Sequence, residues 1–131
     1  MLEIDAFFMN EDRHTNNIAV IYNEKTQKYE LSPFFDQGLC MFADINQDYP
    51  IDQSLEYCLE KIEAKPFSSD FDIQLDAAEE LYGIQIGFQF TFKDIQIYLQ
   101  KNSENYPREV VRRVEQLLRR QMRKYGYLMK K

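Results

Sequence analysis

Two short polar motifs that flank a predicted β-hairpin constrain the fold of this chain more than any other feature. The first motif is D-R-H-T-N-N at residues 12–17, and the second is F-D-Q-G at residues 35–38. Between them, residues 18–31 read as a β-branched strand typical of a buried position, a polar turn and a partner strand. An antiparallel hairpin folds the chain back on itself, so the pattern predicts that Asp12 and Asp36 lie close together.

The rest of the chain is predicted to be mostly helical. Residues 2–9 read as the last turns of a helix that leads into the first motif. Further helices are expected over 52–64, from a cap at Ser69 or Asp70 through Leu81 with Gly83 as the stop, from Thr91 to about Leu99, and from Pro107 to Tyr125. Residues 84–90 alternate like a strand, although an extended linker fits equally well. The predicted class is therefore mainly α with a small antiparallel β-hairpin.

Length and composition favour one packed domain over residues 1–131. The 131 residues include ten Phe and nine Tyr, which is enough apolar material for one sizeable core. No stretch approaches the length of a bilayer-spanning helix, and the amino terminus lacks a signal-peptide pattern, so we expect a cytoplasmic protein without membrane contact. Cys40 and Cys58 are expected to be buried, reduced thiols, since they form no metal-ligand pattern.

The charge is distributed unevenly. The net charge is −6, but residues 107–131 carry nine Lys or Arg against two Glu, so this part is +7 and residues 1–106 carry −13. An acidic chain is a poor general nucleic-acid binder, and direct nucleic-acid binding is not expected. The basic terminal helix at about 107–125 either packs as an amphipathic helix on the acidic body or docks onto nucleic acid or an antitoxin-like protein partner.

The two motifs contain the side chains that phosphoryl transfer needs. That chemistry uses an acid that orients the attacking hydroxyl and two oxygen ligands for the metal on the nucleotide phosphates. Asp12 suits the first role, and Asn17 and Asp36 suit the second. His14 either donates to the transferred phosphate or braces the metal-binding loop, or it only caps backbone carbonyls inside the loop. Arg13 is expected to pair with a neighbouring acid. The alternative is that these are ordinary turn residues, a setting that Asp and Asn favour.

Two smaller expectations concern the same region. Gly38 is expected to supply a backbone conformation that other residues resist. His14 is the single histidine of the chain, which argues against most histidine-ligated metal enzymes.

At these residues the chain resembles the carboxy-terminal lobe of the HipA-like kinases. The resemblance lies in residues 10–17, in the segment S-P-F-F-D-Q-G at 32–38 and in A-K-P-F-S at 64–68, and it covers roughly residues 1–80. It implies a helical lobe with a small hairpin, Mg²⁺ and ATP as cofactors, and transfer to a Ser or Thr hydroxyl. By the same resemblance Asp12, with His14 beside it, takes the catalytic position, and Asn17 and Asp36 take the metal and nucleotide positions. The first motif also resembles phosphatidylinositol kinases, but no basic membrane-binding loop follows Asp36.

The chain departs from the HipA-like pattern in one large respect. Family members carry an amino-terminal lobe with a phosphate-covering loop and a phosphate-binding lysine, whereas the four glycines here form no phosphate-cradling cluster. We therefore expect residues 1–131 to be inactive alone, and to need an N-lobe partner or to be a fragment of a longer kinase. The alternative function is a pseudokinase-type protein-binding module, within a toxin–antitoxin system or with self-association.

Overall fold

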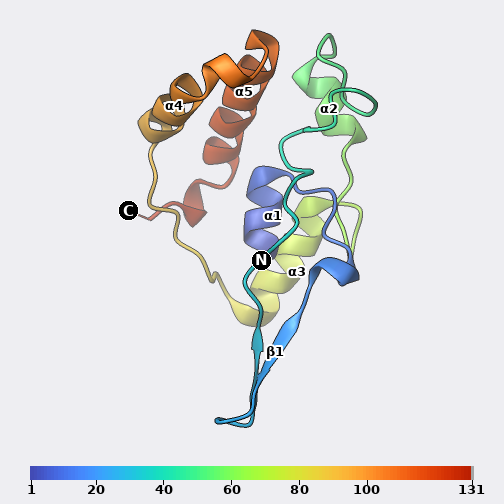
Figure 1. Cartoon of the computed structure of the whole chain (residues 1–131), viewed down its shortest axis with the longest axis vertical. Helices are drawn as coiled ribbons and strands as arrows, with labels where there is room; N and C mark the ends of the chain where they lie inside the picture. The colour runs from blue at the N-terminus through green and yellow to red at the C-terminus, as the bar shows by residue number, and fades with distance from the viewer. Residues whose placement is uncertain (131) are drawn as a thin grey trace.

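The computed structural model describes residues 1–130 as five α-helices, one β-hairpin and three short 3-10 turns. The helices are α1 (Leu2–Phe8), α2 (Leu55–Lys61), α3 (Phe71–Tyr82), α4 (Phe92–Lys101) and α5 (Arg108–Lys124), and the strands are β1 (Val20–Asn23) and β2 (Lys28–Leu31) (Figure 1). The 3-10 turns are Thr15–Asn17, Ser103–Asn105 and Gly126–Leu128. The predicted class, mainly α with a small antiparallel hairpin, is confirmed.

Side-chain caps fix the starts of α3 and α4 where the sequence predicted them. The Asp70 carboxylate accepts hydrogen bonds from two backbone N–H groups in the first turn of α3, at 2.8 and 3.1 Å. Thr91 and Asp94 form a reciprocal capping box at the start of α4. Gly83 follows the last residue of α3 with a φ of 71°, a left-handed conformation that glycine adopts without a steric penalty.

Helix α2 is shorter than predicted, and residues 84–90 adopt the second of their two predicted forms. Helix α2 covers only Leu55–Lys61 of the predicted 52–64, because the Ser54 hydroxyl caps the Tyr57 N–H at 3.1 Å and so sets the start of the helix. Residues 84–90 form an extended link between α3 and α4 and not a sheet strand. Within this link, the Phe88 N–H donates to the Leu128 carbonyl at 2.8 Å, in an isolated bridge to the end of the chain.

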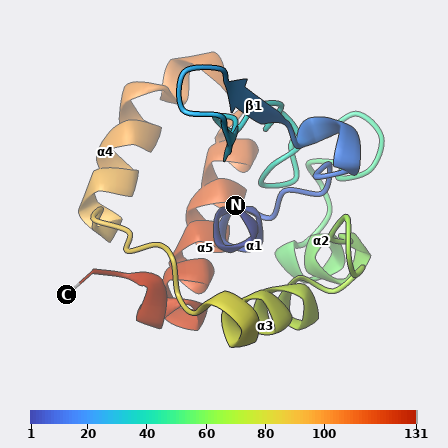
Figure 2. The same ribbon diagram turned by 90° about the horizontal axis from the view of Figure 1, so that it is seen from below.

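Helix α1 is the centre of the domain. Seen end-on, it lies among α2, α3, α4 and α5 (Figure 2), and it packs directly against α3 and α5. Phe7 is fully buried, and its ring lies 4.7 Å from that of Phe88, between centroids. Leu75 from α3 and Leu117 from α5 are buried in the same core. The first motif therefore follows a helix whose position is fixed by tertiary packing.

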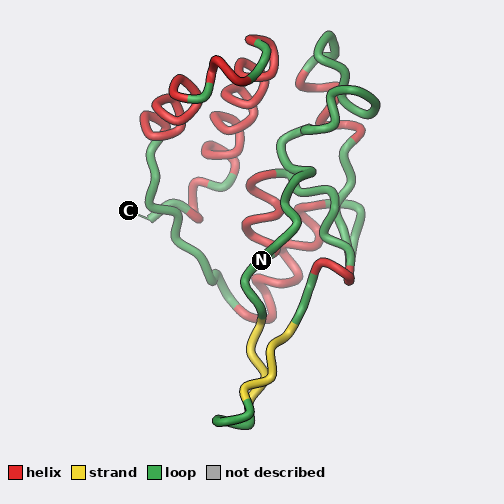
Figure 3. The backbone as a smooth tube through the Cα atoms, viewed as in Figure 1, coloured by secondary structure: helices red, strands yellow, loops and turns green. Residues whose placement is uncertain are grey.

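The hairpin projects away from the helices (Figure 3). Its strands pair antiparallel, with Val20 opposite Leu31 and Tyr22 opposite Tyr29. The prediction of a buried strand here is wrong, because the exposed fractions of these four side chains lie between 47% and 73%. Since alternate residues share a face of a strand, the four form one apolar face that no described segment covers.

Helix α5 is anchored by polar side chains that point inward. The Gln121 amide donates to the carbonyls of Ala6 and Phe7 at 2.9 and 3.1 Å, and these are end-of-helix carbonyls that lack a partner within α1. Arg113 donates to the carbonyls of Tyr49 and Pro50 at 2.8 and 2.9 Å. Arg113 is therefore part of the interior, although it belongs to the predicted basic helix. No helix within residues 1–130 is long and apolar enough to cross a membrane.

Candidate functional site

The side chain of Arg13 ties the first motif to both α1 and the second motif. Its Nε and Nη2 donate to the two carboxylate oxygens of Asp5 at 2.9 and 3.0 Å. Its Nη1 donates to the Asn17 carbonyl at 3.0 Å and to the Phe35 carbonyl at 3.1 Å. Arg13 Nη1 thus holds the two motifs side by side. The hydrogen bonds to Asp5 raise the pKa of Arg13. The predicted pairing of Arg13 with an acid is confirmed.

Backbone groups of Asp12, and not its carboxylate, hold the loop in shape. Asn10 donates to Asp5 at 3.0 Å and accepts the Asp12 N–H at 3.1 Å. The Asn17 Nδ2 donates to the Asp12 carbonyl at 2.8 Å. The Asp12 side chain stays one-quarter exposed, so its carboxylate is accessible from outside. The amide nitrogen of Asn17 is used inside the loop, which leaves Asn17 Oδ1 as the atom suited to a metal.

His14 lies against Asp12 and Asn17. Its Nε2 is 3.2 Å from Asn17 Nδ2 and 3.7 Å from Asp12 Oδ1. If Nε2 accepts from the Asn17 amide, the ring proton is on Nδ1, a buried atom without a hydrogen-bond partner among residues 1–130. These contacts favour the loop-bracing interpretation of His14. Donation from His14 to a phosphate stays a prediction.

Asp36 is the residue with an unusual backbone in the second motif. Its φ is 55°, in the left-handed region that Asp and Asn adopt more readily than most residues do. Gly38 has no such φ and its surroundings are open, so the prediction of a special backbone at Gly38 is wrong. The Asp36 side chain is exposed, and its negative charge contributes to the raised pKa of Arg13.

Lys65 and Gln74 belong to the site, although Gln74 lies in none of the sequence motifs. The Lys65 Nζ lies 3.9 Å from Asp12 Oδ1. The buried amide of Gln74 donates to the Lys65 carbonyl at 3.0 Å and accepts the Phe67 N–H at 2.9 Å. Gln74 therefore fixes the loop that presents Lys65 to Asp12. Two features of the sequence could have pointed to these residues: the A-K-P-F-S segment for Lys65, and the position of Gln74 beside Leu75 on α3.

A hollow of about 350 Å³ opens beside Asp12. The Tyr49 hydroxyl donates to the Glu11 carboxylate in its wall. Burial raises the pKa of Glu11, and the hydrogen bond from Tyr49 opposes that shift. The residues that line the hollow are Glu11, Asp12, Leu39, Asp48, Tyr49, Lys61, Glu63 and Lys65. Charged side chains of both signs therefore border this hollow.

The metal-binding capacity of the two motifs is limited to a few oxygen donors. No group of three or more His, Cys, Asp or Glu gathers anywhere in residues 1–130. The oxygen donors of the two motifs are Asn17 Oδ1, on a residue that is 6% exposed, and the more accessible carboxylates of Asp12 and Asp36. Mg²⁺ commonly takes only one or two protein oxygens and fills its shell with water and phosphate oxygens. A bound Mg²⁺ would therefore need water or phosphate oxygens to complete its shell here.

Both cysteines are free thiols, and the predicted burial is confirmed for Cys58 only. Cys58 is buried and Cys40 is half-buried. Burial raises the pKa of Cys40 to about 11, with Asp5 acting in the same direction and Arg13 against it. Burial also raises the pKa of Cys58.

These pKa shifts predict slow thiol chemistry in the native state. At pH 8 a disulfide reagent should react with native protein much more slowly than with protein in urea, because both thiols stay protonated. An unfolded Cys40 ionises near pH 9.0 and the folded one near 11, so its contribution to stability is complete below pH 9 and is lost as the pH rises toward 11. Cys40→Ser isolates the reaction of Cys58, and equal rates with and without urea would contradict the prediction.

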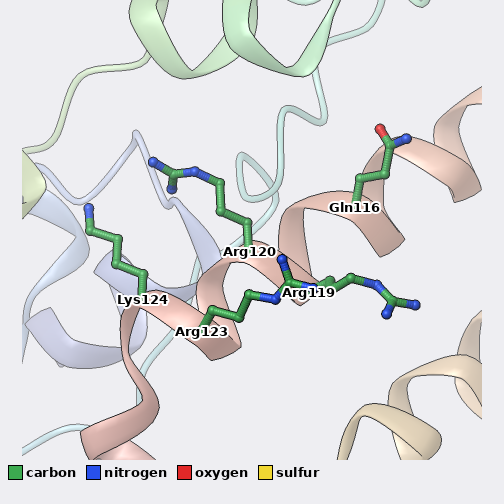
Figure 4. Close-up of a pocket in the computed structure, with 5 residues that line it drawn as sticks. All are labelled: Gln116, Arg119, Arg120, Arg123 and Lys124. Atoms are coloured by element: carbon green, nitrogen blue, oxygen red, sulfur yellow. The ribbon is translucent and has the colours of Figure 1, made fainter.

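Helix α5 presents a basic surface next to the acidic body. Gln116, Arg119, Arg120, Arg123 and Lys124 line a shallow hollow of about 450 Å³ (Figure 4). Although burial acts to raise the pKa of Asp72, hydrogen bonds from Lys124 and Tyr125 lower it. The contact of Lys124 with Asp72 supports packing on the acidic body, and docking of α5 onto nucleic acid or an antitoxin-like partner stays a prediction.

No protein-family model, curated protein or solved structure matches this chain. The function is therefore argued from the geometry of the two motifs and the chemistry of their side chains.

Proposed function

We propose that this chain is the carboxy-terminal catalytic lobe of a HipA-like Ser/Thr protein kinase. It would transfer a phosphoryl group from Mg²⁺-ATP to a hydroxyl, together with a nucleotide-covering lobe that lies outside these 131 residues. The observation that supports this most is the Arg13 contact set. Because Arg13 holds the carbonyls of Asn17 and Phe35 on one nitrogen, the candidate acid and the candidate metal donors come from one small region.

Each residue of that region has a role in the proposed reaction. The bound nucleotide supplies the phosphoryl group, and its metal neutralises the phosphate charge. The Asp12 carboxylate accepts the proton of the attacking hydroxyl and orients its oxygen. Asn17 and Asp36 hold the metal, and Lys65 places a positive charge beside Asp12. Arg13 and Gln74 position these groups without touching substrate.

Reconstitution of the whole kinase tests the proposal. A glycine-rich, lysine-containing lobe encoded beside this chain should form a complex with it, and the complex should transfer labelled phosphate to itself or to a protein. The chain alone should not, because phosphoryl transfer depends on positioning of the nucleotide. Failure of any such complex to transfer phosphate would refute the kinase proposal, and strong activity of the chain alone would refute the need for a second lobe.

Metal binding can be measured on the chain alone. We expect Mn²⁺, used in place of Mg²⁺, to broaden the NMR amide signals of residues near Asn17 and Asp36 before others. Asp36→Asn should weaken this binding about tenfold, since it removes the charged donor. Asp52→Asn, at another exposed aspartate, is the matched control and should leave the binding unchanged. Equal broadening in the two variants would show that the metal binds elsewhere.

A protein-binding module of pseudokinase type is the second candidate. It is favoured by the exposed hairpin face of Val20, Tyr22, Tyr29 and Leu31, because an isolated two-stranded hairpin is marginally stable in water. A thermal-shift measurement discriminates the two candidates. Stabilisation of the reconstituted complex by Mg²⁺-ATP supports the kinase, and unchanged stability together with a persistent complex supports the module.

A further inference from the structure

The outer side of α3 carries an apolar groove, which shares Phe67 and Gln74 with the loop that presents Lys65. Ile73, Ala77 and Leu81 recur every fourth residue and so form one row on the helix surface. The exposed fractions of Ile73 and Leu81 are 64% and 74%. The row borders a groove of about 340 Å³ with mostly apolar walls, whose lining is Leu2, Phe67, Ser68, Ile73, Gln74, Ala77, Ala78, Leu81 and Tyr82.

The shape of this groove suits a helix. Two adjacent alanines, Ala77 and Ala78, line it and allow a close approach of another backbone. The Phe67 side chain stands on the loop beside α3 and is 74% exposed, so it forms a second apolar wall. Large apolar side chains exposed together in this way mark protein-binding surfaces.

Charge on the edge of the groove selects the kind of helix. Asp76 and Glu80 are exposed on α3 directly beside the apolar row, one turn apart. Neither takes part in an ion pair with the described residues, whereas the neighbouring Asp72 is bound by Lys124. The apolar row therefore has an acidic edge on one side and Phe67 on the other.

We propose that the α3 groove binds an amphipathic helix of another polypeptide, with apolar residues at helical spacing and Lys or Arg along one edge. The apolar stripe of that helix packs between Phe67 and Leu81, and its basic edge pairs with Asp76 and Glu80. The binding involves no nucleotide, so it stands or falls separately from the proposed kinase activity.

Two labelled model peptides of about 16 residues test the proposal on the whole chain by fluorescence anisotropy, both with leucines at helical spacing. One has lysines along its polar edge and the other glutamates. The lysine peptide should bind about fivefold tighter, with the difference shrinking at high salt. Leu81→Asp should weaken its binding about tenfold or more, because a buried leucine contact is lost. Ile97→Asp, at an exposed isoleucine of α4, is the matched control and should leave the binding of the lysine peptide unchanged.

Charge reversal provides the decisive comparison. The double variant Asp76→Lys with Glu80→Lys should prefer the glutamate peptide. Absence of binding by both peptides, or equal loss in Leu81→Asp and Ile97→Asp, would overturn the proposal. Sedimentation of the chain alone tests whether a second copy of the chain occupies the groove. A dimer that dissociates in Leu81→Asp would assign the groove to that second copy and overturn the proposal too.

Discussion

Replacing Arg13 with methionine is expected to lower the free energy of unfolding by about 3–5 kcal/mol, because it leaves the Asp5 carboxylate buried without its cation. Arg13 is 1% exposed, and its guanidinium makes four hydrogen bonds to Asp5, Asn17 and Phe35. The loss therefore includes two backbone carbonyls that no longer receive a donor. Urea unfolding followed by circular dichroism measures the change.

The matched control is Arg112→Met on α5. Arg112 is exposed, so its loss should change the free energy of unfolding by no more than about 0.5 kcal/mol. A similar small change in Arg13→Met would mean that the buried pair with Asp5 is not formed in solution.

A double variant separates the charge from the packing. Arg13→Met combined with Asp5→Leu removes both charges and should be more stable than Arg13→Met alone. Replacing a whole buried ion pair by apolar groups destabilises a protein less than removing one partner and leaving the other charge buried. Recovery should stay incomplete, because the Asn10 amide then loses its acceptor on Asp5. A double variant no more stable than the single one would show that the carboxylate is not stranded in Arg13→Met.

The local features of the fold could be predicted from the sequence, because their causes are local. Asp70, Thr91 and Gly83 set helix ends through contacts within a few residues, and the sequence predicts each of them, with Asp70 as one of two candidate caps. The return of the second motif to the first also follows from a local hairpin. The burial of that hairpin could not be predicted, because it depends on what packs against Val20 and Tyr22 and not on their strand propensity.

The tertiary contacts of the site could not be predicted for the same reason. Nothing in the sequence singled out Asp5 as the acid for Arg13 or Gln74 as the support of the Lys65 loop. Arg113 belongs to the basic terminal helix, yet its guanidinium lies against the carbonyls of residues 49 and 50, far away along the chain. Such pairings depend on how helices pack, which periodicity alone does not specify.

In the reconstituted kinase, Asp12→Asn is expected to slow phosphoryl transfer about 10²–10⁴-fold, the range for loss of a general acid or base. The stability of the lobe should change by less than about 0.5 kcal/mol, because the Asp12 carbonyl and N–H hold the loop and the carboxylate is partly exposed. Asp52→Asn is the control and should retain the full rate. The measurement is the initial rate of labelled-phosphate transfer at saturating Mg²⁺-ATP.

Comparison with Asp36→Asn distinguishes the acid from the metal ligand. If Asp36 binds the metal, part of the rate lost in Asp36→Asn should return when the concentration of Mg²⁺ or Mn²⁺ is raised, whereas Asp12→Asn should stay slow at every concentration. Rescue of both variants by metal would make Asp12 a ligand and not the acid. An undiminished rate in Asp12→Asn would remove Asp12 from the reaction altogether, and with it the assignment of the first motif as a catalytic loop.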